Sequence, residues 1–257
     1  MKKIRKFTVV FKPDEGSRLL SEEIKNRMLE KKWIYEEESP EFVFVVGGDG
    51  TFIRAVHDYV DINPIYYPIH TGTLGFFSEF EQNQVDAFLE GLEKECTISE
   101  YPLLCTKIHQ QTIYGINEIR IENPYHTQKT EVLVNGRSFE TLRGSGVCVS
   151  TQAGSTAYNR SLGGSVLANG IQAMQMVEIA GIHNQKYQSL NVPIVFSYGT
   201  VLAFKSEDFD KAILGADSKT YDLKGIHSIE VRYSLNQKVR VWRTGHIEYL
   251  DNLKSLF

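Results

Sequence analysis

In the first part of the chain, up to about residue 98, apolar residues are spaced as in alternating strands and helices. Short apolar runs alternate there with stretches in which apolar residues recur every three or four positions, as at Leu20, Ile24 and Met28. The runs predict strands and the longer period predicts helices, and we expect Ser17 to cap the first helix. Strands are predicted at residues 4–11, 42–46 and 64–69, and helices through residues 20–28, 52–60 and 83–95. Strands that alternate with helices predict a parallel sheet with helices packed on its faces.

After about residue 98 this pattern gives way to shorter segments in which apolar and polar residues alternate. They predict a mostly β domain, in which Asn135-Gly136 is typical of a hairpin turn. Two helices are predicted to interrupt the strands, one from about Ser155 to Gly164 and one over residues 171–179. The predicted strands are residues 103–109, 115–122, 130–134, 138–142, 147–150, 192–196, 201–204, 228–233 and 238–242.

The change of rhythm predicts two domains. We place an α/β domain with a parallel sheet at residues 1–98 and a β-rich domain at residues 99–245. Residues 246–257 are predicted to contain a short closing helix that packs back on the first domain. Ligands of open parallel sheets bind beyond the carboxyl ends of the strands, so the loops that follow the predicted strands are where a site is expected.

The composition is that of an ordinary globular protein and argues against several functional classes. Of the 257 residues 42% are hydrophobic and 23% charged, and 28 Lys and Arg against 32 Asp and Glu give a net charge of −4, which argues against nucleic-acid binding. The basic start at residues 2–6 precedes an apolar run that stops at Lys12, too short for a signal peptide or a membrane span. Cys96, Cys105 and Cys148 are isolated, as in a reducing compartment. We therefore expect a cytoplasmic protein that binds neither nucleic acid nor a membrane.

A glycine-rich turn follows the predicted strand at residues 42–46 and opens the next helix. It reads Gly47-Gly48-Asp49-Gly50-Thr51. Glycines let a ligand approach the backbone closely, and the first amides of a helix are unpaired donors that favour an anion such as phosphate. Because phosphates repel a carboxylate, Asp49 needs a proton, a metal or a reacting hydroxyl beside it, and the pattern indicates phosphoryl chemistry. The alternative is an ordinary turn in which Asp49 caps the helix.

A second glycine turn follows the predicted strand at residues 64–69. It reads Thr71-Gly72-Thr73-Leu74-Gly75-Phe76-Phe77. Because both glycine turns come at the carboxyl ends of parallel strands, we expect them to face the same crevice.

Two stretches of the β-rich half combine polar side chains with strand ends. Asn117 and Glu118 interrupt an apolar pattern, where an amide and a carboxylate can bind the vicinal hydroxyls of a ribose; the alternative is a polar edge strand. Because side chains alternate along a strand, these two share a side only where a bulge or strand end re-aims them. From Gly144 to Tyr158 a strand runs into a hydroxyl-rich turn and a helix start, which suits a polar ligand, although helix capping explains the same residues.

These motifs, in this order and spacing, resemble those of the NAD kinase family over residues 47–164. The chain carries Gly-Gly-Asp-Gly-Thr, His-Thr-Gly-Thr-Leu-Gly-Phe, Asn-Glu, and Gly-Ser-Thr-Ala-Tyr followed by Leu-Gly-Gly. Lipid kinases and phosphofructokinases share the first motif, whereas the Ser-Thr-Ala-Tyr segment is more specific to NAD kinases. The resemblance implies an α/β domain like that of phosphofructokinases and diacylglycerol kinases, a C-terminal β domain, a cleft between the two and a homotetramer.

The resemblance also implies a reaction and the residues that carry it. A phosphoryl group of ATP, or of polyphosphate in some members, would pass to the 2′-hydroxyl of the adenosine ribose of NAD. A divalent cation, usually Mg²⁺, would be held through the donor phosphates, and the scattered histidines show no metal-ligand spacing. Asp49 would be the catalytic carboxylate, with Gly47, Gly48 and Thr51 beside the donor phosphates. The implied NAD-binding residues are Gly50, Phe76, Asn117, Glu118, Ser145, Thr156, Ala157, Tyr158, Ser161 and Ala180.

The chain departs from the family pattern at two places. Ser145 stands where an aspartate that contacts the nicotinamide half of NAD is usual, and Gln152-Ala153 stands where Pro-Thr is usual. Asp217 matches a late aspartate of the family only loosely. These departures leave a second hypothesis open, a dinucleotide-binding or regulatory homologue with weak or no catalysis. A lipid kinase rests on the glycine loop alone.

Overall fold

The computed structural model describes residues 5–72, 75–78, 80–92, 97–243 and 249–254. The chain forms two compact units, one of Met1–Tyr101 with Gln237–Phe257 and one of Pro102–Asn236. It leaves the first unit within strand β6 (Thr97–Ile108) and returns within β17 (Ser228–Arg243). In the described part of the chain, no helix has the length and apolar character that crossing a bilayer requires.

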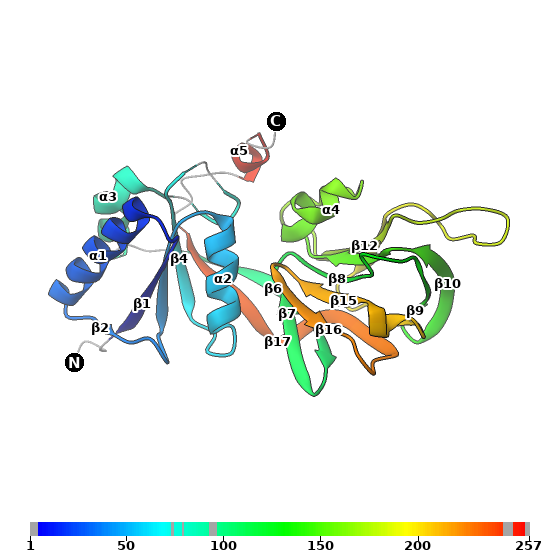
Figure 1. Ribbon diagram of the computed structural model, residues 1–257. Coiled ribbons are helices and arrows are strands. Elements are labelled where there is room, and N and C mark those ends of the chain that lie inside the picture. Colours follow the sequence, from blue (N-terminus) through cyan, green and yellow to red (C-terminus); the bar gives the residue numbers. More distant parts are fainter. Residues whose placement is uncertain (1–4, 73–74, 79, 93–96, 244–248, 255–257) are drawn as a thin grey trace. The chain divides into compact units, whose positions relative to one another are not determined.

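A parallel sheet forms the centre of the first unit (Figure 1). Its strands lie in the order β2, β1, β3, β4, and the last part of β17 pairs with β4 through Arg240 and Val241. The short strand β5 pairs with the carboxyl end of β4. The strands are β1 Lys6–Phe11, β2 Ile34–Tyr35, β3 Phe42–Val46, β4 Ile65–His70 and β5 Phe80–Glu81.

Helices cover both faces of this sheet. Helices α1 (Glu15–Glu30) and α3 (Val85–Gly91) lie on one face and α2 (Asp49–Tyr59) on the other (Figure 1). Because side chains alternate along β3, Phe44 and Val46 pack under α1 and α3, while the equally buried Val43 and Val45 face the other way. Burial on both faces explains why β3 reads as an unbroken apolar run.

The cap predicted for α1 is wrong. The N-cap is Asp14, whose carboxylate accepts a hydrogen bond from the amide of Ser17 at 2.8 Å. Ser17 lies in the first turn instead, where it is fully buried and its hydroxyl oxygen is 3.0 Å from that of Thr71. An acceptor one position before the helix caps it better than a hydroxyl inside the first turn. Asp14 stood between Pro13 and Gly16, in a stretch that sequence reasoning treated only as a strand breaker.

Parts of several predicted elements lie outside the described residues. The closing helix is present as α5 (Tyr249–Lys254), and η1 (Gln82–Gln84) precedes α3 where one longer helix was predicted. The predicted positions outside the described residues are Ile4, Thr73, Leu74, residues 93–95, Cys96 and residues 246–248.

Two layers of antiparallel strands form the second unit. One is a six-stranded sheet in the order β13, β12, β11, β8, β15, β16, and the other carries β10, β9, β14 and the first part of β17. Both layers contribute to one buried core, with Ile119 and Leu214 from the first and Phe204 and Val231 from the second. The remaining strands are β7 Gln111–Gly115, β8 Glu118–Glu122, β9 Gln128–Val134, β10 Arg137–Gly144, β11 Gly146–Ser150, β12 Ala173–Ile179, β13 Ile194–Ser197, β14 Leu202–Lys205, β15 Ile213–Ala216 and β16 Lys219–Asp222.

The predicted hairpin at Asn135-Gly136 is confirmed. Val134 of β9 pairs with Arg137 of β10, and the two residues between them have φ angles of +50° and +77°. Positive φ at both central positions is the signature of a type I′ turn.

The helix predicted over residues 171–179 is wrong, because Ala173–Ile179 form strand β12. This strand lies between β11 and β13, and all of its residues except Glu178 are buried. With both faces covered the strand lacks alternation, and unlike β3 it is not an unbroken apolar run, because Gln175 and Glu178 interrupt it. The helix predicted from Ser155 is present only as η2 (Ala153–Thr156) and the short α4 (Tyr158–Ser161). The predicted fold class, an α/β unit with a parallel sheet followed by a mostly β unit, is confirmed.

Candidate functional site

In the first unit, candidate chemistry gathers at the amino end of α2. Strand β3 ends at Val46, and Gly47 then donates its amide to the carbonyl of Ile69 at 2.9 Å. A Cβ on Gly47 would lie 2.5 Å from the hydroxyl of Thr51, so the turn closes only with glycine there. Gly48 and Gly50 are exposed, and a Cβ on either would meet no atom within 4 Å. The backbone at these two positions is therefore open to a ligand, whereas Thr51 is buried and packs on Gly47.

The carboxylate of Asp49 joins the two glycine turns. It accepts hydrogen bonds from the amides of Phe76 at 2.9 Å and Phe77 at 3.3 Å. A Cβ on Gly75 would lie 2.2 Å from Asp49 Oδ1, so the second turn can contact this carboxylate only because Gly75 has no side chain. The structure thus brings the two turns together, as the topology predicted.

Burial raises the pKa of the Asp49 carboxyl, and the two amides and the neighbouring Arg243 and His70 only partly offset this effect. A carboxylate with a raised pKa is a stronger base, which suits it to accept a proton from a hydroxyl. Sequence reasoning missed Arg243 and His70. The one available signal for Arg243 was a charge at the end of the apolar run of β17.

Both of these residues are almost fully buried. Arg243 donates to the hydroxyl of Tyr101 at 2.5 Å and lies 3.5 Å from the carbonyl of Phe76. His70 Nδ1 lies 2.9 Å from the carbonyl of Gly72, and its Nε2 is buried with no hydrogen-bond partner among the described residues.

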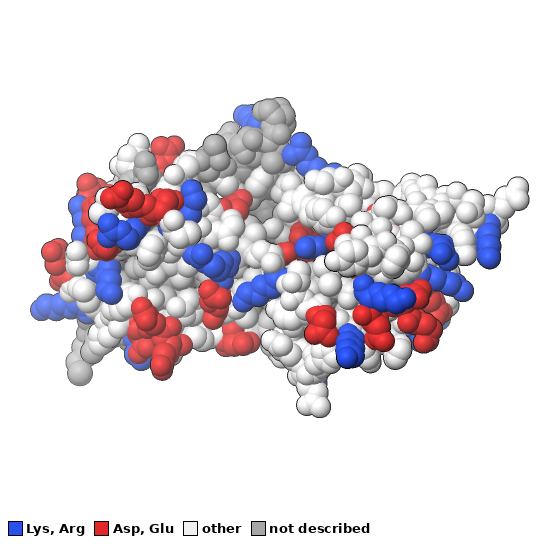
Figure 2. Space-filling view, in the orientation of Figure 1, with Lys and Arg blue, Asp and Glu red and all other residues white. Residues whose placement is uncertain are grey.

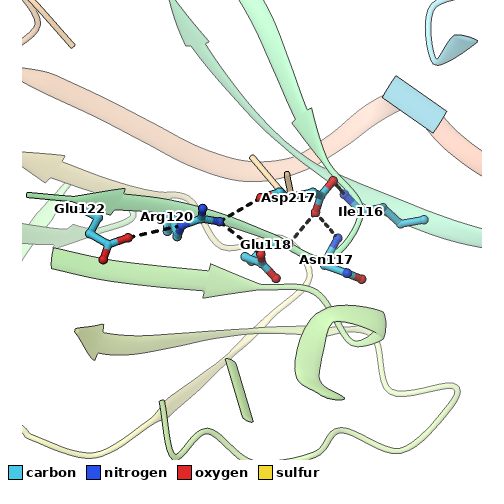
Figure 3. Close-up of polar contacts among 6 residues, drawn as sticks. All are labelled: Ile116, Asn117, Glu118, Arg120, Glu122 and Asp217. Carbon is cyan, nitrogen blue, oxygen red and sulfur yellow. Dashed lines mark hydrogen bonds and ion pairs between the residues drawn. The ribbon is translucent and has the colours of Figure 1, made fainter. Parts of the chain in front are cut away.

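In the second unit, Asn117 lies in a bend between β7 and β8, and Glu118 begins β8. The strand end therefore releases the two side chains from strict alternation, as the ribose-binding interpretation requires. Figure 3 shows that the carboxylate of Asp217 accepts hydrogen bonds from the amides of Ile116, Asn117 and Glu118, at 2.9, 2.7 and 3.1 Å. Residues 115 and 118 belong to two separate strands, where one strand over residues 115–122 was predicted.

The Glu118 carboxyl is buried beside Arg120. Its Oε1 lies 3.5 Å from Arg120 Nη1, while its Oε2 is buried without a hydrogen-bond partner among the described residues. Burial and the nearby Asp217 raise the pKa of Glu118 to about 7, against the opposing effect of Arg120. This carboxyl therefore changes charge near neutral pH.

Thr151 and Gly154, just before the Ser-Thr-Ala-Tyr segment, pack directly on the bend. Thr151 donates its amide to the carbonyl of Asn117 at 2.8 Å and its hydroxyl to that of Ile116 at 2.6 Å. A Cβ on Gly154 would lie 1.9 Å from the carbonyl oxygen of Asn117. Tyr158 lies under Arg120, whose guanidinium carbon is 5.4 Å from the ring centroid. Thr156 and Ala157 are half-buried beside Tyr158, and Ser161 is exposed at the end of α4.

Ser145 and Ala180 lie together, but away from the bend. The amide of Ser145 donates to the carbonyl of Ile179 at 2.9 Å, next to Ala180, which has a φ of +47°. Strand β11 separates them from the bend, because its Ser150 pairs with Glu118 and its Gly146 pairs with Glu122. At about 3.3 Å per residue the two places are roughly 15 Å apart.

No group of three or more His, Cys, Asp or Glu side chains that could hold a metal ion occurs within the described residues.

Two family descriptions match the chain. Residues 11–96 match "ATP-NAD kinase N-terminal domain" and residues 116–245 match "ATP-NAD kinase C-terminal domain". Among similar proteins, "NAD kinase" of Latilactobacillus sakei is 32% identical over 98% of this chain and 97% of its own length. "NAD kinase 1" of Bacillus anthracis is 33% identical over 98% of both chains.

Solved structures of the same fold include two complexes with a nucleotide. The yeast NADH kinase complexed with NADH has a TM-score of 0.84 at 16% identity, over 98% of this chain and 86% of that one. An NAD kinase from Archaeoglobus fulgidus in complex with ATP has a TM-score of 0.81 at 22% identity, over 98% of both chains. At these identities the likeness establishes the fold.

Proposed function

The chain belongs to the NAD kinase family, and from this premise we propose that it transfers a phosphoryl group from ATP to the 2′-hydroxyl of the adenosine ribose of NAD, giving NADP. The observation that carries this proposal is the Asp49 carboxylate at the open amino end of α2, fixed by two amides and raised in pKa. The ATP complex of the Archaeoglobus fulgidus NAD kinase supports ATP as the donor. Polyphosphate is the alternative donor.

Asp49 acts on the acceptor hydroxyl. Its carboxylate orients the 2′-hydroxyl and accepts its proton as the oxygen attacks phosphorus. The bond between the γ-phosphorus of ATP and the oxygen that bridges it to the β-phosphorus breaks, and ADP leaves. The amide bonds from Phe76 and Phe77 hold the carboxylate in one orientation, so no side-chain entropy is lost when the substrate binds.

The backbone around Gly48 and Gly50 accommodates the donor phosphates. The amino end of a helix favours an anion, and the glycines at the start of α2 leave room for phosphate oxygens. A divalent cation, usually Mg²⁺ in such reactions, neutralises phosphate charge when it is bound. This cation would be held through the donor phosphates.

Residues of the second unit bind the dinucleotide. Asn117 and the unpartnered oxygen of Glu118 hold ribose hydroxyls, and Thr156, Ala157 and Tyr158 border the adenosine with Ser161 nearby. Ser145 and Ala180, at the other end of β11, contact the nicotinamide half. A separation of about 15 Å fits two halves of one dinucleotide. Gly50 and Phe76 of the first unit are the other residues to which we assign NAD binding.

The test is NADP formation from NAD with ATP and Mg²⁺, repeated with polyphosphate, for the wild type and Asp49→Asn. Asparagine keeps the size of the side chain and removes the base, so turnover should fall on the order of 10²-fold or more while NAD binding persists. Wild-type protein that binds NAD by calorimetry but forms no NADP would mean a binding or regulatory homologue, the alternative that the departures at Ser145 and Gln152-Ala153 leave open. An unchanged rate in Asp49→Asn would assign the base to another carboxyl.

We also propose a homotetramer in the cytoplasm. The family resemblance and exposed apolar residues near the edge strand β13, such as Leu190 and Val192, support the oligomer.

The free thiols of Cys105 and Cys148 agree with a reducing compartment. Acidic and basic side chains are interspersed over the face shown in Figure 2.

A further inference from the structure

The carboxylate of Asp217 has no part in the chemistry assigned to Asp49, yet it is almost fully buried. Asp217 is the first residue of the two-residue turn that joins β15 to β16, in which Ala216 pairs with Lys219. Its φ is +50°, in the left-handed region. Asparagine and glycine adopt this conformation at least as easily as aspartate. The turn therefore explains the backbone of Asp217 but gives no reason for a buried carboxylate.

The carboxylate ends on the bend that carries the ribose-binding residues. Three consecutive amides, of Ile116, Asn117 and Glu118, donate to it (Figure 3). In return the amide of Asp217 donates to the carbonyl of Glu118 at 3.0 Å. Buried amides without an acceptor would cost free energy, so this carboxylate fixes the backbone conformation of residues 116–118.

Arg120 extends the same arrangement to Tyr158. Its Nη1 donates to the carbonyl of Asp217 at 3.0 Å, its Nε lies 3.5 Å from Glu122 Oε2, and its guanidinium covers the Tyr158 ring. Gly215 pairs with Arg120 across the sheet, and a Cβ on Gly215 would lie 2.6 Å from the guanidinium carbon. The missing side chain at Gly215 thus makes room for Arg120 to lie across β15.

We propose that Asp217 is a positioning residue for dinucleotide binding: its carboxylate sets the bend that aims Asn117 and Glu118 at the ribose, and its carbonyl holds Arg120 over Tyr158. This inference rests on the proposed function, because it assumes that these residues contact NAD. It predicts that a change at Asp217 acts on affinity for NAD through Asn117, and not on the chemical step at Asp49.

The first test is Asp217→Asn. Asparagine keeps the positive φ and one acceptor oxygen, but its NH₂ group faces the amide of Ile116, donor against donor. We expect the KM and Kd for NAD to rise about tenfold while kcat changes less than about threefold. Amide hydrogen exchange at residues 116–118 should become faster. Asp222→Asn is the matched control, since Asp222 is an exposed carboxylate at the end of β16 in the same hairpin.

The second test is a double-mutant cycle with Asn117→Ala. If Asp217 acts by aiming Asn117, the effect of Asn117→Ala on NAD affinity should largely disappear in the Asp217→Asn background. Asp217→Gly, which also keeps the positive φ, replaces Asp217→Asn if that variant does not fold. The inference is overturned if NAD affinity is unchanged in a folded Asp217 variant, or if the two effects are fully additive. If the wild-type protein binds NAD but forms no NADP, the proposed function is refuted and the inference about Asp217 is not. Calorimetry and hydrogen exchange of the Asp217 variants then still test that inference.

Discussion

At the scale of single residues, Asp49 is held by contacts that permit very little movement. Two amides fix its carboxylate oxygens, and Gly75 approaches one of them so closely that no side chain fits between. Burial raises the pKa of this carboxyl, while the amides stabilise its charged form. Burial therefore makes the group a stronger base, and the amide hydrogen bonds keep it pointed in one direction.

Gly75→Ala tests this arrangement. The new methyl group would lie 2.2 Å from Asp49 Oδ1, so the carboxylate or the turn must shift. We expect kcat for NADP formation to fall about tenfold or more, with the KM for NAD changed less than about threefold. Gly72→Ala is the control in the same turn, because a Cβ there meets nothing within 4 Å. Wild-type kcat in Gly75→Ala would show that the position of Asp49 is not critical.

Glu118 provides a prediction about stability and pH. Its pKa is about 7 in the folded protein against 4.5 as the reference value, so between these pH values the folded state binds more protons than the unfolded state. This difference in proton binding stabilises the folded state below the unfolded pKa of Glu118, and the stabilisation is lost as the pH rises through about 7. Its contribution to the free energy of unfolding is at most about 3 kcal/mol. Urea unfolding at pH 5 and pH 8 measures it.

Glu118→Gln should remove this part of the pH dependence and make the protein relatively more stable than the wild type at pH 8. The exposed Glu230→Gln is the control on β17 of the same unit. Equal pH dependence in the wild type and Glu118→Gln would mean that the carboxyl is ionised throughout this range.

At the scale of elements, the turn of η2 and the bend at Asn117 form one structural block. Thr151 and Gly154 contact the carbonyls of Ile116 and Asn117, and these contacts join segments more than 30 residues apart. The two motifs of the proposed dinucleotide site therefore hold each other in place.

Gly154→Ala should disturb both motifs at once. Its Cβ would lie 1.9 Å from the carbonyl oxygen of Asn117, which is backbone and cannot move aside alone. We expect the free energy of unfolding to fall by about 1–3 kcal/mol and NAD affinity to weaken. Gly199→Ala, at an exposed glycine with no atom near its Cβ position, should change neither quantity. If Gly154→Ala binds NAD like the wild type, the bend does not depend on η2.

The spacing of apolar residues predicted those elements whose sequence pattern matches their burial. Strand β3 and helix α2 were predicted because an apolar run and a helical stripe each match one kind of burial. Strand β12 was missed because Gln175 and Glu178 interrupt its apolar run, so that Ala173, Met176 and Val177 recur at helical spacing. The glycine turns and the Asn117–Glu118 bend were recognised as motifs, but the roles of Arg120, Arg243 and Asp217 depend on contacts between distant segments. Asp217, for instance, lies about 100 residues from its partners, and no local pattern reveals such a pairing.

At the scale of the whole molecule, one edge of the six-stranded sheet is exposed. Strand β13 pairs only with β12 among the described strands, and Val195 on it is 48% exposed. The preceding segment adds Leu190 and Val192, which are also exposed; it belongs to a loop that extends beyond the sheet (Figure 1). An apolar strand edge left in water favours pairing with another chain, so proteins usually cover it. The proposed tetramer would cover this edge.

Val195→Lys tests whether this edge forms the subunit interface. A buried, unpaired lysine in an interface is costly, so the variant should show a mass below the four times 29.3 kDa expected of a tetramer, as measured by light scattering. Leu19→Lys introduces the same charge at an exposed apolar position on α1 and should leave the mass unchanged. Circular dichroism must show that both variants are folded. A Val195→Lys protein that remains tetrameric would exclude β13 from the interface, whereas a monomeric wild type would refute the tetramer itself.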